Sequence, residues 1–341
     1  MPASAMDVVR TASQHTMDQL FKPFRLGQWT RLAVTGLLAG ELSTSGGIGF
    51  RFPSIPRNSS GAENFLAQSI ASPRGLLLAV LPFLVLLGIG LLILFIYISS
   101  RMRFVLFDSV VAKECHIRRF WNQRREPGFR YFLWNLAFIF AMIGGFVTLA
   151  GACVGIVFGF GWQRNPREHL IPLIIGGIIV ALIFIAFLVL VVVIAVLTKD
   201  FVVPQMALED ISAVQGWQRL WSMLKTEKTG YAGYIGLKIL LSIAAMVGLG
   251  IAALIVTLVV LVPFGLLGVI AVFGGKALGL AWNVLTISAA VLAGCVAFAT
   301  ILYAVLLLTV PTIVFFPAYS IYFFAPRYEP LIKLLSTPQT R

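Results

Sequence analysis

Five runs of the sequence contain no Asp, Glu, Lys or Arg, and each run is long enough to cross a membrane. They cover residues 75 to 100, 131 to 163, 169 to 198, 239 to 273 and 277 to 326. A helix needs about 20 apolar residues to span the hydrocarbon core of a bilayer. The runs are rich in Leu, Ile, Val and Phe, without the strict alternation of a transmembrane barrel. The sequence therefore predicts an all-α integral membrane protein.

The composition narrows the possible functions. Hydrophobic residues make up 59% of the chain and charged residues 11%, whereas about 25% of residues are charged in soluble domains. The three cysteines, Cys115, Cys153 and Cys295, lack metal-ligand spacing, and the chain has no HExxH, GxSxG or phosphate-loop motif. We therefore expect no cofactor and no bound metal. No secretory signal pattern is found, so we expect the first helix to be kept.

A weaker apolar segment precedes the first long run. "LAVTGLLAG" at 32 to 40 ends at Glu41 and continues into polar residues, so this segment either spans the membrane or re-enters it. With a short crossing at 32 to 50, the chain has six crossings and 20 of its 26 Lys and Arg lie on one side. The positive-inside rule then makes both termini cytoplasmic. Anionic lipid headgroups are the expected partners of these basic residues, and nucleic acid is not.

An amphipathic segment precedes each pair of apolar segments. On a helical wheel, residues 204 to 224 place apolar side chains on one face and polar ones, Gln205 among them, on the other, which predicts a helix parallel to the membrane. Similar segments lie at the N-terminus and at 103 to 121. Phe104 and Phe201 are 97 residues apart. We predict one membrane domain over residues 1–341 with approximate repeats 1–100, 101–198 and 199–326, each an amphipathic helix followed by a helical hairpin, and a short tail, 327–341.

A family resemblance follows from the motifs of these segments. "DFVVPQM" at 200 to 206, "GWQRLW" at 216 to 221 and "FKPFRLGQW" at 21 to 29 resemble those of an uncharacterised prokaryotic multi-pass family. That family is similar to the membrane domain attached to some glycerophosphodiester phosphodiesterases. The resemblance implies a location in the prokaryotic inner membrane. It implies no hydrolytic activity, because the chain has no room for the separate catalytic barrel.

Three carboxylates are candidates for structural or functional roles. Asp210 lies on the apolar face of segment 204 to 224, seven residues before a Trp, and Glu114 lies seven residues before another Trp. We predict that Asp210 and Glu114 are equivalent and that each is held in a buried ion pair or caps the N-terminus of a neighbouring helix, with site chemistry as the alternative. Glu41 marks a helix end at the outer interface. If it is buried instead, it pairs with a cation or lines a translocation path.

Other residues have plainer interpretations. Gly151, Gly155 and Gly159 form a row of small residues for close helix packing, within the chain or between copies. Lys238 starts an apolar run and is expected to snorkel towards the headgroups. Pro311 and Pro317 are expected to kink or break the last helix. The remaining candidates are interface anchors near the starts of spans: Trp29, Trp121 and Trp217.

Three functional hypotheses fit these features. The first is a non-enzymatic scaffold or accessory subunit that organises a partner membrane protein, a second copy or lipid. The second is a transporter or pore for a small uncharged or amphiphilic solute. The third is a membrane enzyme that modifies lipid, with Glu114 and Asp210 as acid or base groups. The scaffold is favoured because ionisable groups are almost absent from the predicted spans.

Overall fold

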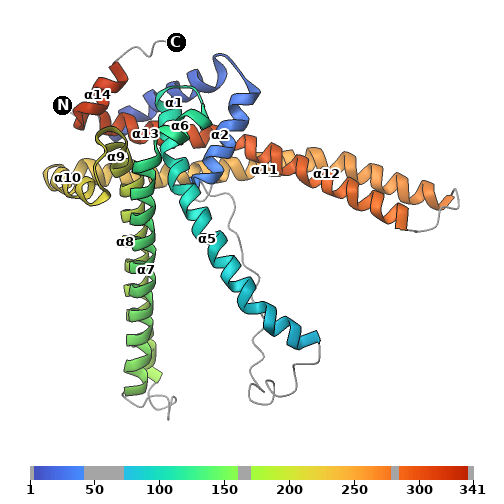
Figure 1. The fold of residues 1–341 in the computed structure, drawn as a ribbon, viewed down its shortest axis with the longest axis horizontal. Coiled ribbons are helices and arrows are strands. Elements are labelled where there is room, and N and C mark those ends of the chain that lie inside the picture. Colours follow the sequence, from blue (N-terminus) through green and yellow to red (C-terminus); the bar gives the residue numbers. More distant parts are fainter. Residues whose placement is uncertain (1–3, 42–72, 160–169, 278–283, 337–341) are drawn as a thin grey trace.

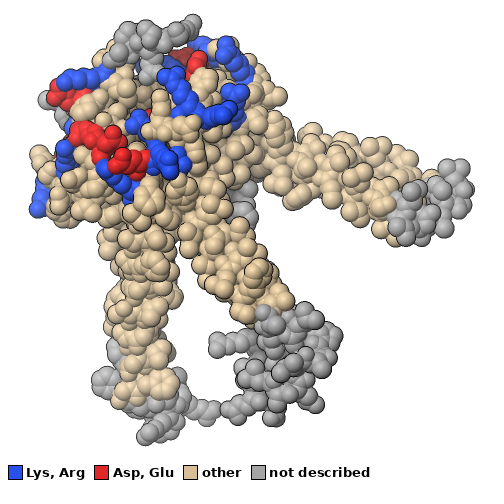
Figure 2. All heavy atoms as spheres, viewed as in Figure 1, with Lys and Arg blue, Asp and Glu red and all other residues tan. Residues whose placement is uncertain are grey.

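The protein forms a head from which three arms extend (Figure 1), and the charged side chains gather on the head (Figure 2). The structure is a computed structural model that describes residues 4–41, 73–159, 170–277 and 284–336. In those residues all regular structure is helical. The helices of the head are α1 Ala5–Phe21, α2 Leu26–Leu38, α6 Ile117–Gln123, η1 Thr198–Val202, α9 Val203–Glu209, α10 Ala213–Thr226, α13 Val310–Phe324, η2 Ala325–Arg327 and α14 Glu329–Ser336.

The arms contain the long apolar helices. The first arm is the N-terminal part of α5 Pro73–Val111, the second is the pair α7 Arg125–Gly159 and α8 Leu170–Leu197, and the third is the pair α11 Lys228–Ala277 and α12 Val284–Leu308. Within the described residues, five helices are long and apolar enough to cross a membrane. Their most apolar windows have no buried residues. The predicted integral membrane protein is therefore confirmed at the level of its helices.

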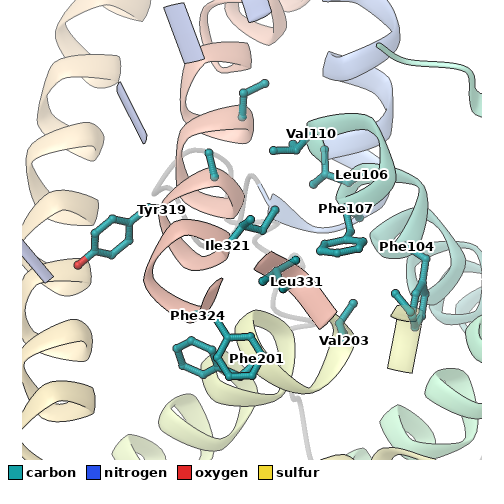
Figure 3. Close-up of a cluster of buried hydrophobic side chains, with 14 of the residues drawn as sticks. Phe104, Leu106, Phe107, Val110, Phe201, Val203, Tyr319, Ile321, Phe324 and Leu331 are labelled. Atoms are coloured by element: carbon teal, nitrogen blue, oxygen red, sulfur yellow. The ribbon is translucent and has the colours of Figure 1, made fainter. Parts of the chain in front are cut away.

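The head has a hydrophobic core of its own, built around α13. Phe323 and Phe324 from this helix are fully buried against Phe201 of η1, at ring-centroid distances of 6.0 and 5.2 Å. Phe104 and neighbouring side chains of α5 close the other side (Figure 3). A buried aromatic side chain typically removes about 150 to 250 Å² of surface from water. The core therefore holds the roots of the arms together.

Single helices run from an arm into the head where their composition changes. In α5, Leu91 and Phe95 are more than half exposed, whereas Phe104 and Val105 are fully buried. The change follows the sequence, because α5 is uncharged from Gly75 to Ser100 and then meets Arg101. In the view of Figure 2 the visible Lys and Arg side chains lie on the head.

The segment 204 to 224 is not one continuous helix. It breaks at Asp210, which has φ 52° in the left-handed region, and α10 then starts with a capping box between Ser212 and Gln215. The faces also differ from the predicted ones, since Gln205 is fully buried and Trp221 is 56% exposed. A second elbow of this kind lies between α5 and α6, where Lys113 has φ 56°.

The last apolar run breaks near the first of its two prolines. Helix α12 ends at Leu308, and α13 begins at Val310 with Pro311 in its first turn, where a missing amide hydrogen costs little. Helix α13 continues through Pro317. The aromatic segment that follows is buried core, with Tyr319 and Phe323 fully inaccessible.

Residues 32 to 41 do not carry the chain away from the head. Helix α2 packs against α5 and α13, and Glu41 lies beside Lys199 of η1 and Arg103 of α5. This corrects the expectation that Glu41 marks a helix end on the opposite side of the membrane. A crossing before α5 would have to lie in residues 42–72, outside the described residues.

The glycine row of α7 packs against nothing in the described chain. A Cβ atom built at Gly151, Gly155 or Gly159 would have open space within 4 Å. The close contact between α7 and α8 lies elsewhere, at Gly145, where a Cβ atom would approach the ring of Phe187 to 2.9 Å. The expectation that another helix of this chain covers the row is therefore wrong for the described residues.

Candidate functional site

A cluster of charged side chains is buried where the arms meet the head. Its members are contributed by the end of α2, by α5, by η1 and by α11. We call it the root cluster, and it consists of Glu41, Arg103, Lys199, Asp200, Tyr234 and Lys238. Because buried charges cost several kcal/mol each unless they are paired, their pairing decides what the cluster can do.

Glu41 reaches the cluster through a turn at Gly40. Gly40 has φ 76°, a conformation open to glycine at no steric cost, and the chain turns back there towards the head. Glu41 is 4% exposed and forms ion pairs with Lys199 and with Arg103, the latter at 3.6 Å. Burial acts to raise the pKa of Glu41, but the attraction of Lys199 and Arg103 outweighs it and lowers the pKa. Glu41 is therefore a buried, paired carboxylate.

The second half of the cluster centres on Asp200. Its Oδ2 atom accepts a hydrogen bond of 2.9 Å from the Tyr234 hydroxyl and is ion-paired with Lys238. Lys238 is 4% exposed, so the expectation that it snorkels towards headgroups is wrong. Tyr234 and Lys238 are one helical turn apart on α11, and this spacing lets both reach the same carboxylate.

The local backbone of η1 makes both halves possible. Lys199 and Asp200 are adjacent in a π-helical turn, a wider turn that is often found at functional sites. Four of its five residues, including Asp200 and Phe201, are buried. The turn thus directs Lys199 to Glu41 and Asp200 to Lys238, and it joins α2, α8 and α11 through charged contacts.

The root cluster is closed. The cavity beside it has a volume of about 30 Å³, and a cavity of that size holds about one water molecule. Each carboxylate accepts from cationic groups, so neither is placed as a free base. Within the described residues, no group of three or more His, Cys, Asp or Glu could hold a metal ion. The geometry suits a structural joint between arms.

Further ion pairs fasten the outside of the head. Arg124 forms a bidentate pair with Asp108, at 2.8 and 3.0 Å, and also donates to the carbonyl oxygen of Ala207. Arg327 forms a second bidentate pair with Glu227, at 2.8 and 2.6 Å, which lowers the pKa of Glu227. Bidentate pairs of this kind fix geometry as well as charge. They connect α5 to α9 and the end of α10 to η2.

Asp210 and Glu114 are not buried pairs. Asp210 is exposed at the elbow after α9, and its backbone carbonyl oxygen accepts a hydrogen bond of 2.5 Å from Arg130. The Glu114 side chain is 60% exposed and pairs with His116 at 3.1 Å. They also do not match each other in the backbone, since the left-handed residue 97 positions before Asp210 is Lys113. The proposed buried role for both is wrong, because the elbow turns them out of the apolar face.

Each of the three tryptophans lies in the helix that directly follows an elbow or tight turn. The indole of Trp29 donates to the carbonyl oxygen of Leu20 at 3.0 Å, and that of Trp217 donates to the Thr198 hydroxyl at 3.0 Å. Trp121 instead lies under Arg101, with the guanidinium 4.0 Å from its ring centroid. Each Trp therefore ties its helix to an earlier helix of the chain. All three are half-buried.

Sequence reasoning missed most of the root cluster. The signal for Lys238 was its isolation, since residues 229 to 275 contain no other charge, and a lone charge in an apolar run implies a buried partner as readily as a headgroup. Lys199 and Asp200 directly follow an uncharged run, so both lie at the end of that run. Nothing in the sequence pattern pairs them with Glu41, because the pairing depends on the fold.

The comparisons identify a family and no activity. A family model described as a family of unknown function (DUF7544) matches residues 3–332, and the chain belongs to that family. No curated protein and no solved structure matches the chain. The resemblance to the membrane domain attached to phosphodiesterases gains no support from these comparisons.

Proposed function

We propose that this chain is a non-enzymatic polytopic membrane protein, a scaffold or accessory subunit that organises a partner membrane protein or lipid. The observation that carries the proposal is the contrast between the head and the arms. The buried charges of the head are paired around a cavity of about 30 Å³, whereas the arms expose apolar side chains such as Val189 and Leu254 by 56% and 63%. Such surfaces are available for lateral contacts within a membrane.

The proposed setting is the cytoplasmic membrane of a prokaryote, with the head on the cytoplasmic side. The 20 Lys and Arg assigned to inner segments, the both-ends-inside layout with six crossings and the three repeated units all belong to this proposal. So does a distant relation to the membrane domain of glycerophosphodiester phosphodiesterases. The helices near the elbows are then interfacial, and anionic headgroups contact the basic residues of the head.

The two other hypotheses need features that the described residues do not offer. A transporter needs a polar path to the middle of the membrane, and the root cluster lies at the arm roots beside a cavity for about one water. A lipid enzyme with Glu114 and Asp210 as acid and base needs the two carboxylates at one site, and both are exposed on separate elbows.

Photocrosslinking in native membranes tests the scaffold. A photoreactive residue placed at Val189 or Leu254, both exposed on arms, is expected to give adducts of defined mass with one partner protein or one lipid class. The matched control is Leu220, which is fully buried in the head and is expected to give none. Arm adducts that spread over abundant membrane proteins and lipids in proportion to their amounts would contradict the proposal. Flux of a small solute through purified protein in liposomes would contradict it as well.

A further inference from the structure

Two adjoining hollows form a basic groove on the head between α2 and α6. The first has a volume of about 620 Å³ and is lined by Arg118 and Arg119, and the second has about 240 Å³ and is lined by Arg25. Arg31 and His116 line both hollows. We call this surface the α2/α6 groove. Its position coincides with Lys and Arg gathered on the α2 side of the head (Figure 2).

The four arginines of the groove, Arg25, Arg31, Arg118 and Arg119, have no carboxylate partner among the described residues, as is also true of Arg10, Arg101 and Arg125 outside it. Five other arginines of the head have carboxylate partners: Arg103, Arg124, Arg130, Arg219 and Arg327. The carboxylate that lines the groove, Glu114, pairs with His116. The groove therefore keeps an uncompensated positive charge that favours an anion.

The groove lies beside exposed apolar side chains and beside an apolar helix long enough to cross a membrane. Thr30, next to Arg31 on α2, contacts the hydroxyl of Tyr303 at 3.2 Å, and Tyr303 lies on the spanning helix α12. Helix α2 also exposes Leu26 and Leu37, by 53% and 39%. A ligand in this place meets arginines and apolar side chains together. That combination suits a lipid, with its phosphate among the arginines and its chains along α2 and α12.

We infer that the α2/α6 groove binds the headgroup of an anionic phospholipid that carries two phosphate groups. Arg118 and Arg119 line the first hollow, Arg25 lines the second and Arg31 lines both, so each hollow can hold one phosphate. Arginine suits this task because its planar guanidinium donates two parallel hydrogen bonds to phosphate oxygens. The inference rests on the proposed contact between the head and anionic lipids, and it adds the site and the headgroup class.

Native mass spectrometry of the full chain in detergent tests the site. The probes are a cardiolipin with two phosphates, a phosphatidylglycerol with one, and a zwitterionic phosphatidylcholine. The variants are Arg118→Gln with Arg119→Gln, and Arg25→Gln with Arg31→Gln. The control is Arg10→Gln with Arg125→Gln, which removes the same charge from exposed arginines outside the groove. We expect cardiolipin to bind at least tenfold more tightly than phosphatidylglycerol, and each groove variant to weaken cardiolipin about 10- to 30-fold.

Each contrary outcome has a distinct meaning. Equal affinity for the two anionic lipids, or an equal loss in the control variant, would overturn the two-phosphate site while leaving general contact with anionic lipids intact. No preference for anionic lipid over phosphatidylcholine would overturn the contact itself. Inorganic pyrophosphate is added as a soluble competitor. If it binds the groove in the absence of lipid as tightly as cardiolipin does, the ligand is a free phosphate compound and the lipid assignment is wrong.

Discussion

At the scale of single residues, the protein places its charges where the chain leaves the apolar arms. Lys238 and Asp200 are 4% and 3% exposed, yet both lie beside long uncharged runs. A buried ion pair is weak evidence for stability, but the loss of one partner leaves an unpaired charge in a medium of low dielectric constant. The root cluster is therefore expected to be intolerant of single substitutions and tolerant of paired ones.

The substitution Lys238→Met is expected to destabilise the protein by about 3 to 5 kcal/mol, because Asp200 loses its cationic partner. Adding Asp200→Asn should restore much of the loss, since the stranded charge is then gone. Thermal unfolding in detergent, read as the melting temperature, measures both effects. Lys228→Met is the control, because Lys228 is exposed and surface substitutions change stability by about 0.5 kcal/mol or less. A Lys238→Met variant that melts like the parent would restore the snorkelling interpretation.

His15 makes the head sensitive to pH. Its Nε2 atom lies 3.0 Å from the Val110 carbonyl oxygen, which can only accept, and its Nδ1 atom lies 3.0 Å from the Tyr322 hydroxyl. Both contacts are therefore satisfied by a neutral imidazole. Burial lowers the pKa of His15, and the charge of Lys113 lowers it further. In the unfolded chain the pKa is about 6.5.

The unfolded state thus binds the extra proton first as the pH falls. We expect the contribution of His15 to the free energy of unfolding to be constant above about pH 7. This contribution is lost as the pH drops below about 6.5 towards the lower pKa of the folded state. The stability lost between pH 7.5 and pH 5.5, measured by unfolding, should be smaller for His15→Gln than for the parent protein. An identical pH dependence in the two proteins would exclude His15 as its source.

At the scale of elements, the elbows decide which residues are buried. Lys113 and Asp210 adopt the left-handed conformation between α5 and α6 and between α9 and α10. Each elbow changes the direction of the chain, so a helical wheel drawn through it assigns the wrong face to residues beyond it. This is why Asp210 and Trp221, both placed on the apolar face of one continuous helix, are exposed.

Asp210→Gly is expected to stabilise the protein slightly, by up to about 1 kcal/mol, because glycine adopts φ 52° without steric cost. Asp210→Ala should cost about 1 kcal/mol, well below the ~3 to 5 kcal/mol expected if Asp210 belonged to a buried ion pair. Ser212→Ala is the reference variant for the size of the effect, since loss of the cap at the start of α10 costs about 1 kcal/mol of stability. Melting temperatures of the three variants give the comparison, and a large loss for Asp210→Ala would return Asp210 to a buried role.

The sequence predicts the elements better than their contacts. Uncharged runs and hydrophobic periodicity depend on neighbours along the chain, so the long helices were predicted. The pairing of Glu41 with Lys199 joins residues 158 positions apart, and no local pattern encodes it. The failure at Gln205 is of the same kind, because a polar side chain can be buried where it finds a hydrogen-bond partner, here the carbonyl oxygen of Phe201 at 3.1 Å.

At the scale of the whole molecule, the arms differ in length and direction. Helix α8 has 28 residues and α11 has 50, which at 1.5 Å per residue are about 42 and 75 Å long. Both exceed the ~30 Å of a hydrocarbon core, and a helix that is too long for the bilayer tilts. The α11/α12 arm also runs in a clearly different direction from the α7/α8 arm (Figure 1).

An arm on the membrane surface would need a polar face, and α11 has none between residues 239 and 275, which carry no charge. We therefore expect both arms to enter the same bilayer, with the α11/α12 arm the more tilted. Spin labels at Ile183 of α8 and Ile255 of α11, both about half exposed, should report positions near the bilayer centre when oxygen and a nickel chelate are used as relaxants. A label at Val214 of α10, which is 53% exposed, should report headgroup depth. If the Ile255 label also lies at headgroup depth, the α11/α12 arm rests on the surface and the count of spanning helices is wrong.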